Sequence, residues 1–221
     1  MYPWAYTWNP IGGPCLHACD YCYVGRLVKR GVKKYSPDKE PYLLEKELKT
    51  NLTIPDTHVL FVCSCYDMFG SWVPNEWIEK ILARCREFLD TTFLFQSKNP
   101  ANFFKFKGLF PQKTILGVTL ETNRNYEVTK APAPVLRYQD IMYNGEYLAF
   151  RWMVSIEPVM NFDRMILLRW MAVLRPEFVS IGADSGENGL DEPDSLTLKH
   201  LISDLEKFTE VRLKKNLVRL L

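Results

Sequence analysis

The segment CLHACDYCY, residues 15–23, carries three thiols within eight positions: Cys15, Cys19 and Cys22. Thiolates are soft ligands that suit zinc and iron. A structural zinc site has four protein ligands, and His17 is poorly placed to be the fourth because it lies between the first two cysteines. A [4Fe–4S] cluster has four irons, so three thiolates leave one iron open to a small molecule. The spacing therefore favours a catalytic iron–sulfur cluster over a structural metal.

Composition sets the broad class of the protein. The chain has 221 residues, is 47% hydrophobic and carries a net charge of +2, which suits one domain over residues 1–221 with a sizeable core. No apolar run is long enough to span a membrane, and the N-terminal residues do not resemble a signal peptide. We therefore expect a cytoplasmic protein, in which cysteines are ligands, catalytic groups or core residues rather than disulfides.

Six apolar runs predict the strands that position the cysteines. They are almost continuously hydrophobic and are separated by helical patterns, which is typical of parallel strands covered on both faces. The sequence therefore predicts an α/β fold, a partial (β/α)6 barrel of parallel strands, with a doubly wound sheet as the alternative. The runs span residues 4–9, 58–64, 91–97, 114–121, 150–157 and 178–184.

Three helices are expected at 75–89, 163–174 and 194–208. The middle one is apolar on most sides, which predicts burial. Asp194 or Ser195 is the expected N-cap of the last one. Residues 131–134, APAP, are expected to form a loop.

Polar residues follow the predicted strands where they end. The carboxyl ends of parallel strands open onto one face of a β/α fold, and sites form there. Strands also end in polar residues simply because the chain reaches water, but this explains Glu121 and Glu157 less well, since each closes a strongly apolar run. The residues in question are Asp67, Ser97, Lys98, Glu121, Glu157 and Asp184.

The pattern C-x3-C-x2-C, with Tyr21 before the last cysteine, resembles the signature of the radical S-adenosylmethionine (SAM) superfamily. It follows a short predicted strand and precedes a basic segment, residues 24–34. The blocks TWNPIGG, FVCSCYDMFG, FQSKNP, GVTLETN, VSIEPVM and SIGADSG resemble a compact, phage-associated branch of that superfamily. A more distant resemblance is to spore photoproduct lyase, a DNA-repair member with the same cysteine spacing.

This resemblance implies a fold derived from the TIM barrel and a specific chemistry. The cluster on the three cysteines would bind SAM at its open iron, cleave it reductively and produce a 5′-deoxyadenosyl radical that abstracts hydrogen from a substrate. The resemblance implies that Tyr21 packs against the adenine of SAM, and that Asp67 or a nearby carbonyl binds its methionyl amino group. It implies that Ser97 and Lys98 bind the SAM carboxylate and that Thr119 and Glu121 bind the ribose. Three further residues would face SAM or substrate: Glu157, Asp184 and Ser185.

The other three cysteines have separate interpretations. Cys85 lies on the apolar face of a predicted helix and is expected in the core. Cys63 and Cys65 straddle Ser64 at a strand end, and alternate residues of a strand point the same way. We expect packing for Cys63 and assign to Cys65 the role of hydrogen-atom donor to a substrate radical.

The expected partners follow from the chemistry and the charge. A radical SAM enzyme needs an external one-electron reductant of the flavodoxin or ferredoxin type. The basic segments 25–34 and 210–221, with nearby aromatics, suggest a nucleic-acid substrate, and a peptide or partner protein is the other candidate. The competing functions are a zinc-containing nucleic-acid-binding module without catalysis and a non-catalytic iron–sulfur electron carrier.

Overall fold

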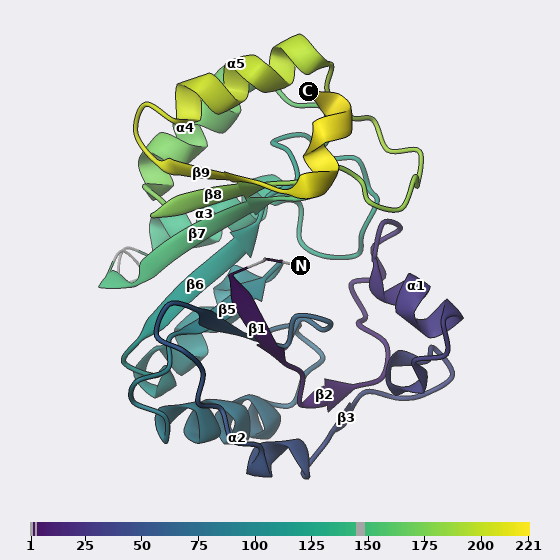
Figure 1. Cartoon of the computed structure of the whole chain (residues 1–221), viewed down its shortest axis with the longest axis vertical. Helices are drawn as coiled ribbons and strands as arrows, with labels where there is room; N and C mark the ends of the chain where they lie inside the picture. The colour runs from purple at the N-terminus through teal and green to yellow at the C-terminus, as the bar shows by residue number, and fades with distance from the viewer. Residues whose placement is uncertain (1, 3, 145–148) are drawn as a thin grey trace. The chain divides into compact units, whose positions relative to one another are not determined.

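The computed structural model describes residues 2, 4–144 and 149–221 (Figure 1). The chain forms two compact units: Met1–Ala18 with Cys22–Leu116, and Cys19–Tyr21 with Gly117–Leu221. The expectation of a single domain stays a prediction.

Parallel strands form the centre of the first unit. β1 (Ala5–Trp8) pairs with β4 (Val59–Val62), and β4 pairs with β5 (Phe93–Ser97), all in parallel. Around them lie α1 (Val24–Lys29), η1 (Lys33–Tyr35), η2 (Glu47–Lys49), α2 (Asn75–Arg86), η3 (Pro100–Leu109) and a short antiparallel pair, β2 (Ile11–Gly12) with β3 (Tyr42–Leu43). The expected strands and the helix over 75–89 are thus confirmed, although α2 ends three residues earlier.

An aromatic cluster fills the core of this unit. Phe69 is fully buried, and its ring centroid lies 4.6 Å from that of Phe103 and 5.9 Å from that of Phe110. Cys85 is buried on the inner face of α2, as expected. Because Phe69 lies in the loop that follows β4 (Val59–Val62), this packing fixes the conformation of that loop.

The second unit repeats the strand–helix alternation. β7 (Arg151–Ile156), β8 (Phe178–Ile181) and β9 (Glu210–Leu213) are parallel neighbours. This unit also contains α3 (Pro134–Tyr143), α4 (Arg164–Leu174), α5 (Ser195–Leu205) and η5 (Lys215–Leu220). β6 (Thr114–Thr119) crosses the boundary of the two units, since the second begins at Gly117. The strands follow one another as β1-β4-β5-β6-β7-β8-β9 in a seven-stranded sheet. The six expected strands are present, and β9 adds a seventh.

Two expectations for the helices hold only in part. Residues 131–134 are not all loop, because Pro134 is the first residue of α3, a position where its fixed φ favours a helix. The expected burial of 163–174 holds for only one face of α4, since Met165 is 69% exposed and Ile166 is 48% exposed.

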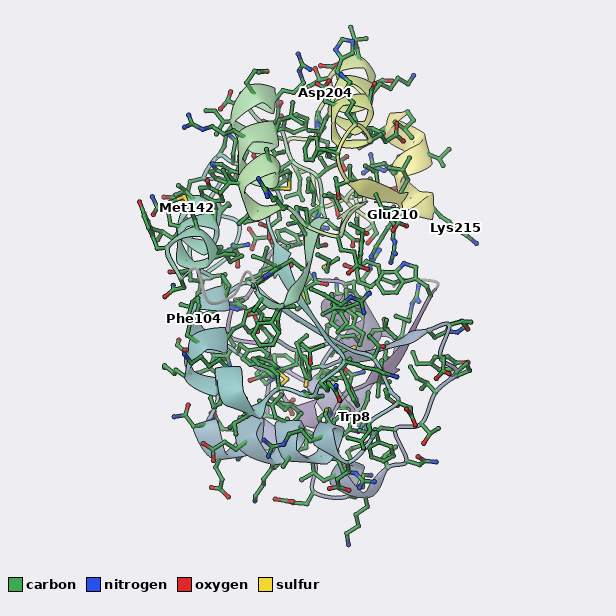
Figure 2. The ribbon with its side chains drawn as sticks, turned by 90° about the vertical axis from the view of Figure 1, so that its left-hand side faces the viewer. Trp8, Phe104, Met142, Asp204, Glu210 and Lys215 are labelled. Atoms are coloured by element: carbon green, nitrogen blue, oxygen red, sulfur yellow. The ribbon has the colours of Figure 1, made fainter. Side chains whose placement is uncertain are left out.

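A capping hydrogen bond starts α5 at its N-terminus, and an ion pair connects α5 to α4. The Asp194 side chain accepts a hydrogen bond from Thr197 N–H at 2.8 Å, which confirms Asp194 as the N-cap. Figure 2 marks Asp204 on α5, where the Arg164 guanidinium of α4 forms an ion pair with it. Across the described residues, every helix is too short or too polar to cross a bilayer.

Candidate functional site

The three cysteines lie on the loop between β2 and α1. Ala18 N–H donates to Cys15 O at 3.2 Å, and Ala18 adopts a φ of +44°, so the loop turns back on itself. Gly25 N–H donates to Cys22 O at 3.2 Å and starts α1 there. Cys15 and Cys19 are half-buried and Cys22 is exposed, and all six cysteines, which lie in the described part of the chain, are outside disulfides.

Cys15 and Cys22 belong to the first unit and Cys19 to the second. Among the described residues, no three His, Cys, Asp or Glu side chains come together as a metal site. The donor set still fits an iron–sulfur cluster in type and number, because three thiols outside disulfides lie on one short loop.

His17 connects the first part of this loop to the segment after β4. Its Nε2 lies 2.8 Å from Asp67 Oδ2, and both residues are buried, at 3% and 8% exposure. The His17 ring also packs edge-on against Trp72, with 4.7 Å between ring centroids. His17 is therefore a structural contact of the cysteine loop.

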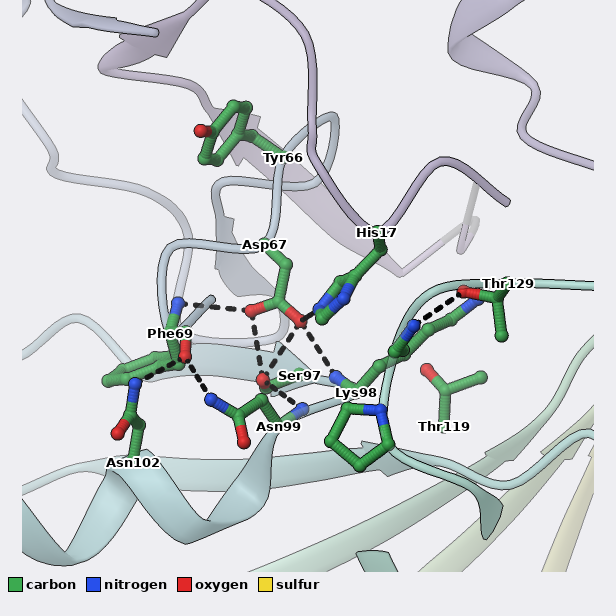
Figure 3. A network of polar contacts seen from close by, with 12 residues as sticks. His17, Tyr66, Asp67, Phe69, Ser97, Lys98, Asn99, Asn102, Thr119 and Thr129 are labelled. Atoms are coloured by element: carbon green, nitrogen blue, oxygen red, sulfur yellow. Dashed lines mark hydrogen bonds and ion pairs between the residues drawn. The ribbon is translucent and has the colours of Figure 1, made fainter. Parts of the chain in front are cut away.

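Asp67 accepts hydrogen bonds from a second strand end as well (Figure 3). Ser97 Oγ donates to Oδ1 at 2.8 Å, and the backbone N–H of Lys98 donates to Oδ2 at 2.8 Å. Phe69 N–H donates to Oδ1 at 3.0 Å. One carboxylate thus joins the cysteine loop, the segment after β4 and the end of β5.

Two asparagines complete this network. Asn99 and Asn102 each donate a side-chain N–H to Phe69 O at 2.8 Å, as Figure 3 shows. Asn99 N–H also donates to Ser97 Oγ at 2.8 Å. The hydroxyl of Ser97 therefore both donates to Asp67 and accepts from the backbone.

The pKa of Asp67 reflects a balance of opposed effects. Burial alone would raise it, but the hydrogen bond and charge of His17, with the donors from Lys98 N–H and Ser97, lower it below its ordinary value. The carboxylate is therefore held ionised inside the unit, as a buried charge must be when it is stabilised by donors.

In the second unit, Tyr21 anchors the other part of the loop. The Tyr21 hydroxyl donates a short hydrogen bond to Glu121 Oε1, and Arg137 Nη1 lies 2.8 Å from Glu121 Oε2. Arg137 is fully buried and Glu121 is 3% exposed. Asp20 N–H donates to Val128 O at 3.0 Å in the same region.

Arg137 also holds the backbone around this pair. It donates to Thr119 O at 2.9 Å and to Pro132 O at 2.5 Å. Its Nη2 is buried and has no hydrogen-bond partner among the described residues. Cys19 Sγ lies 3.1 Å from Thr129 Oγ1, so a thiol of the loop contacts the same connecting segment.

A family match and a structural likeness place this chain among known proteins. The family described as "Protein of unknown function (DUF5131)" matches residues 3–190. The chain belongs to the DUF5131 family. Among curated proteins, no match was found.

Solved structures resemble this DUF5131 chain in fold. A mutant of spore photoproduct lyase is 11% identical with a TM-score of 0.62, covering 94% of this chain and 75% of that one. Streptococcus suis SuiB bound to its precursor peptide SuiA is 10% identical with a TM-score of 0.61, covering 96% and 49%. A second lyase mutant, with bound AdoMet and dinucleoside spore photoproduct, is 11% identical with a TM-score of 0.54, covering 92% and 61%.

These likenesses confirm the predicted fold class, a partial barrel of parallel strands. The DUF5131 chain spans about half of the SuiB chain. Its likeness to the phage-associated branch stays a prediction.

Two further strand-end carboxylates of the DUF5131 chain have partners within the second unit. Glu157 forms an ion pair with Lys214 of the segment after β9. Asp184 accepts from Gly186 N–H at 3.0 Å and from the backbone and side-chain N–H groups of Asn188 at 2.6 and 2.7 Å. Asp184 thus caps its own loop, and its predicted role toward SAM or substrate stays a prediction, as do the roles of the other strand-end residues.

The two cysteines after β4 do not follow the expected strand alternation. β4 ends at Val62, and Cys63 has a φ of +57°, so the chain leaves the extended conformation between them. Cys63 is buried, as expected. Cys65 is half-buried, with its Sγ 3.4 Å from the Tyr23 hydroxyl and its N–H donating to Asn9 Oδ1 at 2.9 Å.

The two basic segments of the DUF5131 chain differ in how their charges are satisfied. In the tail, Arg212 pairs with Glu210 and Arg219 pairs with Glu192. Lys29, Arg30 and Lys33 are exposed, and within the described residues no ion pair involves them. Two cations of the tail are therefore paired with carboxylates, whereas the segment after the cysteines exposes its cations to solvent.

Sequence reasoning missed Arg137, which completes the Tyr21 anchor. The only signal was one cation in an otherwise apolar and neutral run, PVLRYQ. A buried cation needs an acidic partner, and Glu121 at a strand end was an available one.

Replacing Asp67 by Asn tests the anchor of the cysteine loop. The amide removes the charge and turns one acceptor into a donor, leaving buried donors unpaired. We expect the free energy of unfolding at pH 7 to fall by about 3 kcal/mol, measured by urea titration, with exposed Asp56→Asn as the control.

The difference in stability between wild type and Asp67→Asn should also depend on pH. Since the folded pKa of Asp67 is lowered, its contribution is complete above the unfolded pKa of about 3.9 and is lost as pH falls through the folded pKa. The difference between wild type and Asp67→Asn should shrink below about pH 4. A difference that grows on acidification would contradict this account.

Proposed function

We propose that this DUF5131 chain is a radical SAM enzyme that carries a [4Fe–4S] cluster on Cys15, Cys19 and Cys22. The observation that carries the proposal is the loop of three thiols, anchored by buried charged residues on a fold shared with proteins solved with bound AdoMet. Three thiolates leave one iron open for SAM. When bound, the reduced cluster supplies one electron to SAM and so generates a 5′-deoxyadenosyl radical that abstracts hydrogen from the substrate.

The residues of this chain hold the cysteine loop in place. His17 with Asp67, and Tyr21 with Glu121, fix the conformations from which the cysteines extend, so little loop ordering remains when the cluster binds. Because Asp67 and Glu121 are already occupied by these contacts, we assign them a positioning role in addition to their predicted contacts with SAM. Ser97, Lys98, Thr119, Glu157 and Asp184 remain the proposed contacts of SAM and substrate.

The substrate is a nucleic acid or a peptide. The lyase mutant was solved with a dinucleoside spore photoproduct and SuiB with a precursor peptide. The alternative function, a zinc-containing nucleic-acid-binding module, uses the same cysteines. The proposed cluster requires a reducing compartment such as the cytoplasm.

Anaerobic reconstitution separates these functions. We expect about four irons per chain and release of 5′-deoxyadenosine from SAM under dithionite. Replacing Cys15, Cys19 or Cys22 by Ala should abolish both, whereas Cys85→Ala, which lies in the core of α2, should retain the iron. A colourless protein with one bound zinc would support the alternative and contradict the proposal.

Cys65 is the proposed hydrogen-atom donor. Its thiol lies beside the hydroxyl of Tyr23, and burial, followed by the charge of Cys65, raises the pKa of both Tyr23 and Tyr35. These phenols therefore stay protonated around the thiol. In the proposed step, the S–H bond breaks homolytically, a C–H bond forms on the substrate radical, and the thiyl radical is restored by one electron from the external reductant and one proton.

Deuterium exchange tests this role without knowledge of the substrate. In D2O the Cys65 thiol carries deuterium, so 5′-deoxyadenosine formed in the absence of substrate should contain deuterium taken from it. We expect Cys65→Ala to reduce this incorporation at least threefold, measured by mass spectrometry, and Cys85→Ala to leave it unchanged. Equal incorporation in all three proteins would rule out Cys65 as the donor.

The exposed cations after the cysteine loop favour an acidic electron donor. Cys22 is exposed and its carbonyl begins α1, so the basic helix adjoins a proposed cluster ligand. Lys29, Arg30 and Lys33 present positive charge there, and charge complementarity accelerates encounter with a negative partner. We place the docking surface of a flavodoxin- or ferredoxin-type reductant on this segment.

Charge reversal tests the docking surface. The triple variant Lys29→Glu, Arg30→Glu, Lys33→Glu should slow 5′-deoxyadenosine release at least tenfold when reduced flavodoxin is the donor, and the wild-type rate should fall with added salt. With dithionite the variant should match wild type. The control reverses three exposed lysines elsewhere: Lys105, Lys199 and Lys215. Equal slowing with both donors would indicate damage to the cluster instead.

A further inference from the structure

Four neighbouring strands of the second unit present a row of polar side chains. Ser155 of β7 pairs in register with Ser180 of β8, and Ser180 pairs with Arg212 of β9. Leu120 N–H donates to Ser155 O at 2.8 Å, which in a parallel ladder places Thr119 beside Ser155. Residues in register on neighbouring strands point to the same face, so Thr119, Ser155 and Ser180 form what we call the hydroxyl row.

Two hydroxyls of this row are buried without partners. Ser155 and Ser180 are each 1% exposed, and neither Oγ has a hydrogen-bond partner among the described residues. Buried hydroxyls are almost always hydrogen-bonded, because leaving one unsatisfied costs stability. Two such groups on adjacent strands therefore point to a polar ligand that satisfies both.

An ion pair borders the row on one side. Glu157, Gly182 and Lys214 each lie one residue past the ends of β7, β8 and β9. Glu157 pairs with Lys214, and a Cβ on Gly182 would lie only 3.0 Å from Glu157 Cδ. Because Gly182 has no side chain, the Glu157 side chain has room to extend past it toward Lys214. The ion pair at this border therefore depends on a glycine at position 182.

Glu210 and Arg212 form a second charged pair beside the row. Arg212 Nε and Nη2 donate to the Glu210 carboxylate at 2.8 and 3.0 Å, and the guanidinium lies 3.7 Å from the ring centroid of Phe178. Figure 2 marks Glu210 on β9. Each cation around the hydroxyl row therefore has its own carboxylate.

The hydroxyl row and the paired charges beside it favour an uncharged ligand group. A charged ligand group placed over the row would be desolvated without a counter-ion of its own, because both cations and both carboxylates are already paired. Hydroxyls both donate and accept, so the matching group carries an N–H beside a C=O.

We propose that Ser155 and Ser180 form a substrate subsite that binds a neutral amide-type group, such as the lactam edge of a pyrimidine or a carboxamide. This inference rests on the proposed function in that it names the substrate class of the same enzyme. The two serines bind the group, and the Glu157–Lys214 pair limits the subsite at its border.

The stability of the double variant Ser155→Ala, Ser180→Ala gives the first test. Removing two unsatisfied hydroxyls should leave the melting temperature of the apoprotein unchanged or raise it. If the serines instead serve the fold, the variant should melt at least 4 °C lower, and that result would overturn the assignment. Ser203→Ala, exposed on α5, is the matched control.

Small probes give the second test, measured by saturation-transfer NMR on the full chain. Uracil represents the nucleobase source and acetamide the carboxamide source, with orotate and acetate as their anionic counterparts. We expect a neutral probe to bind at least tenfold more tightly than its anion, and the double variant to lose at least fivefold in affinity. Ser203→Ala should bind like wild type.

The outcomes separate the subsite from the proposed function. Binding of neither neutral probe, or equal binding by wild type and the double variant, would overturn the subsite even if wild type cleaves SAM. Serine-dependent binding by a protein that releases no 5′-deoxyadenosine would retain the subsite and overturn the radical function. Preference for uracil or for acetamide decides between the two sources.

Discussion

The buried Asp67 carboxylate is the contact on which the geometry of the cysteine loop depends. Desolvating a carboxylate is costly unless donors surround it, and Asp67 meets this requirement with the His17 ring, the Ser97 hydroxyl and two backbone N–H groups. These donors come from three separate segments. Any displacement of one segment leaves a buried charge undersatisfied, so the electrostatic cost enforces their mutual positions.

In the second unit, the buried carboxylate of Glu121 plays a similar role through its contacts with Arg137 and Tyr21. Buried ion pairs add little net stability, but removing one partner is strongly unfavourable. The Glu121–Arg137 pair with the Tyr21 hydroxyl therefore specifies one conformation more than it strengthens the fold. Strand-end carboxylates that a sequence suggests as ligands of a cofactor can thus serve first to hold the chain that carries the cofactor.

The sequence predicted elements whose signal is local and missed those that depend on distant partners. The runs at 58–64 and 178–184 became strands because continuous apolar residues have few alternatives to burial. β9 was missed because EVRL is short and half charged, and its charges are matched only across the sheet or along it. Carboxylates at strand ends were visible in sequence, but their partners, His17 and Arg137, were not, because no spacing rule links residues fifty or sixteen positions apart.

The state of each polar group in the absence of ligand distinguishes an anchor from a binding site. An anchor is satisfied by the chain itself, as are Asp67, Glu121 and Asp184. A group that binds a ligand reversibly must lack that partner when the ligand is away, and the protein accepts lower stability there. By this criterion the buried, unpartnered hydroxyls of Ser155 and Ser180 mark the proposed subsite, although serines within apolar strands carry no sequence signal of chemistry. In the second unit, the buried polar groups that the fold leaves without a hydrogen bond are therefore the best indicators of where a ligand binds.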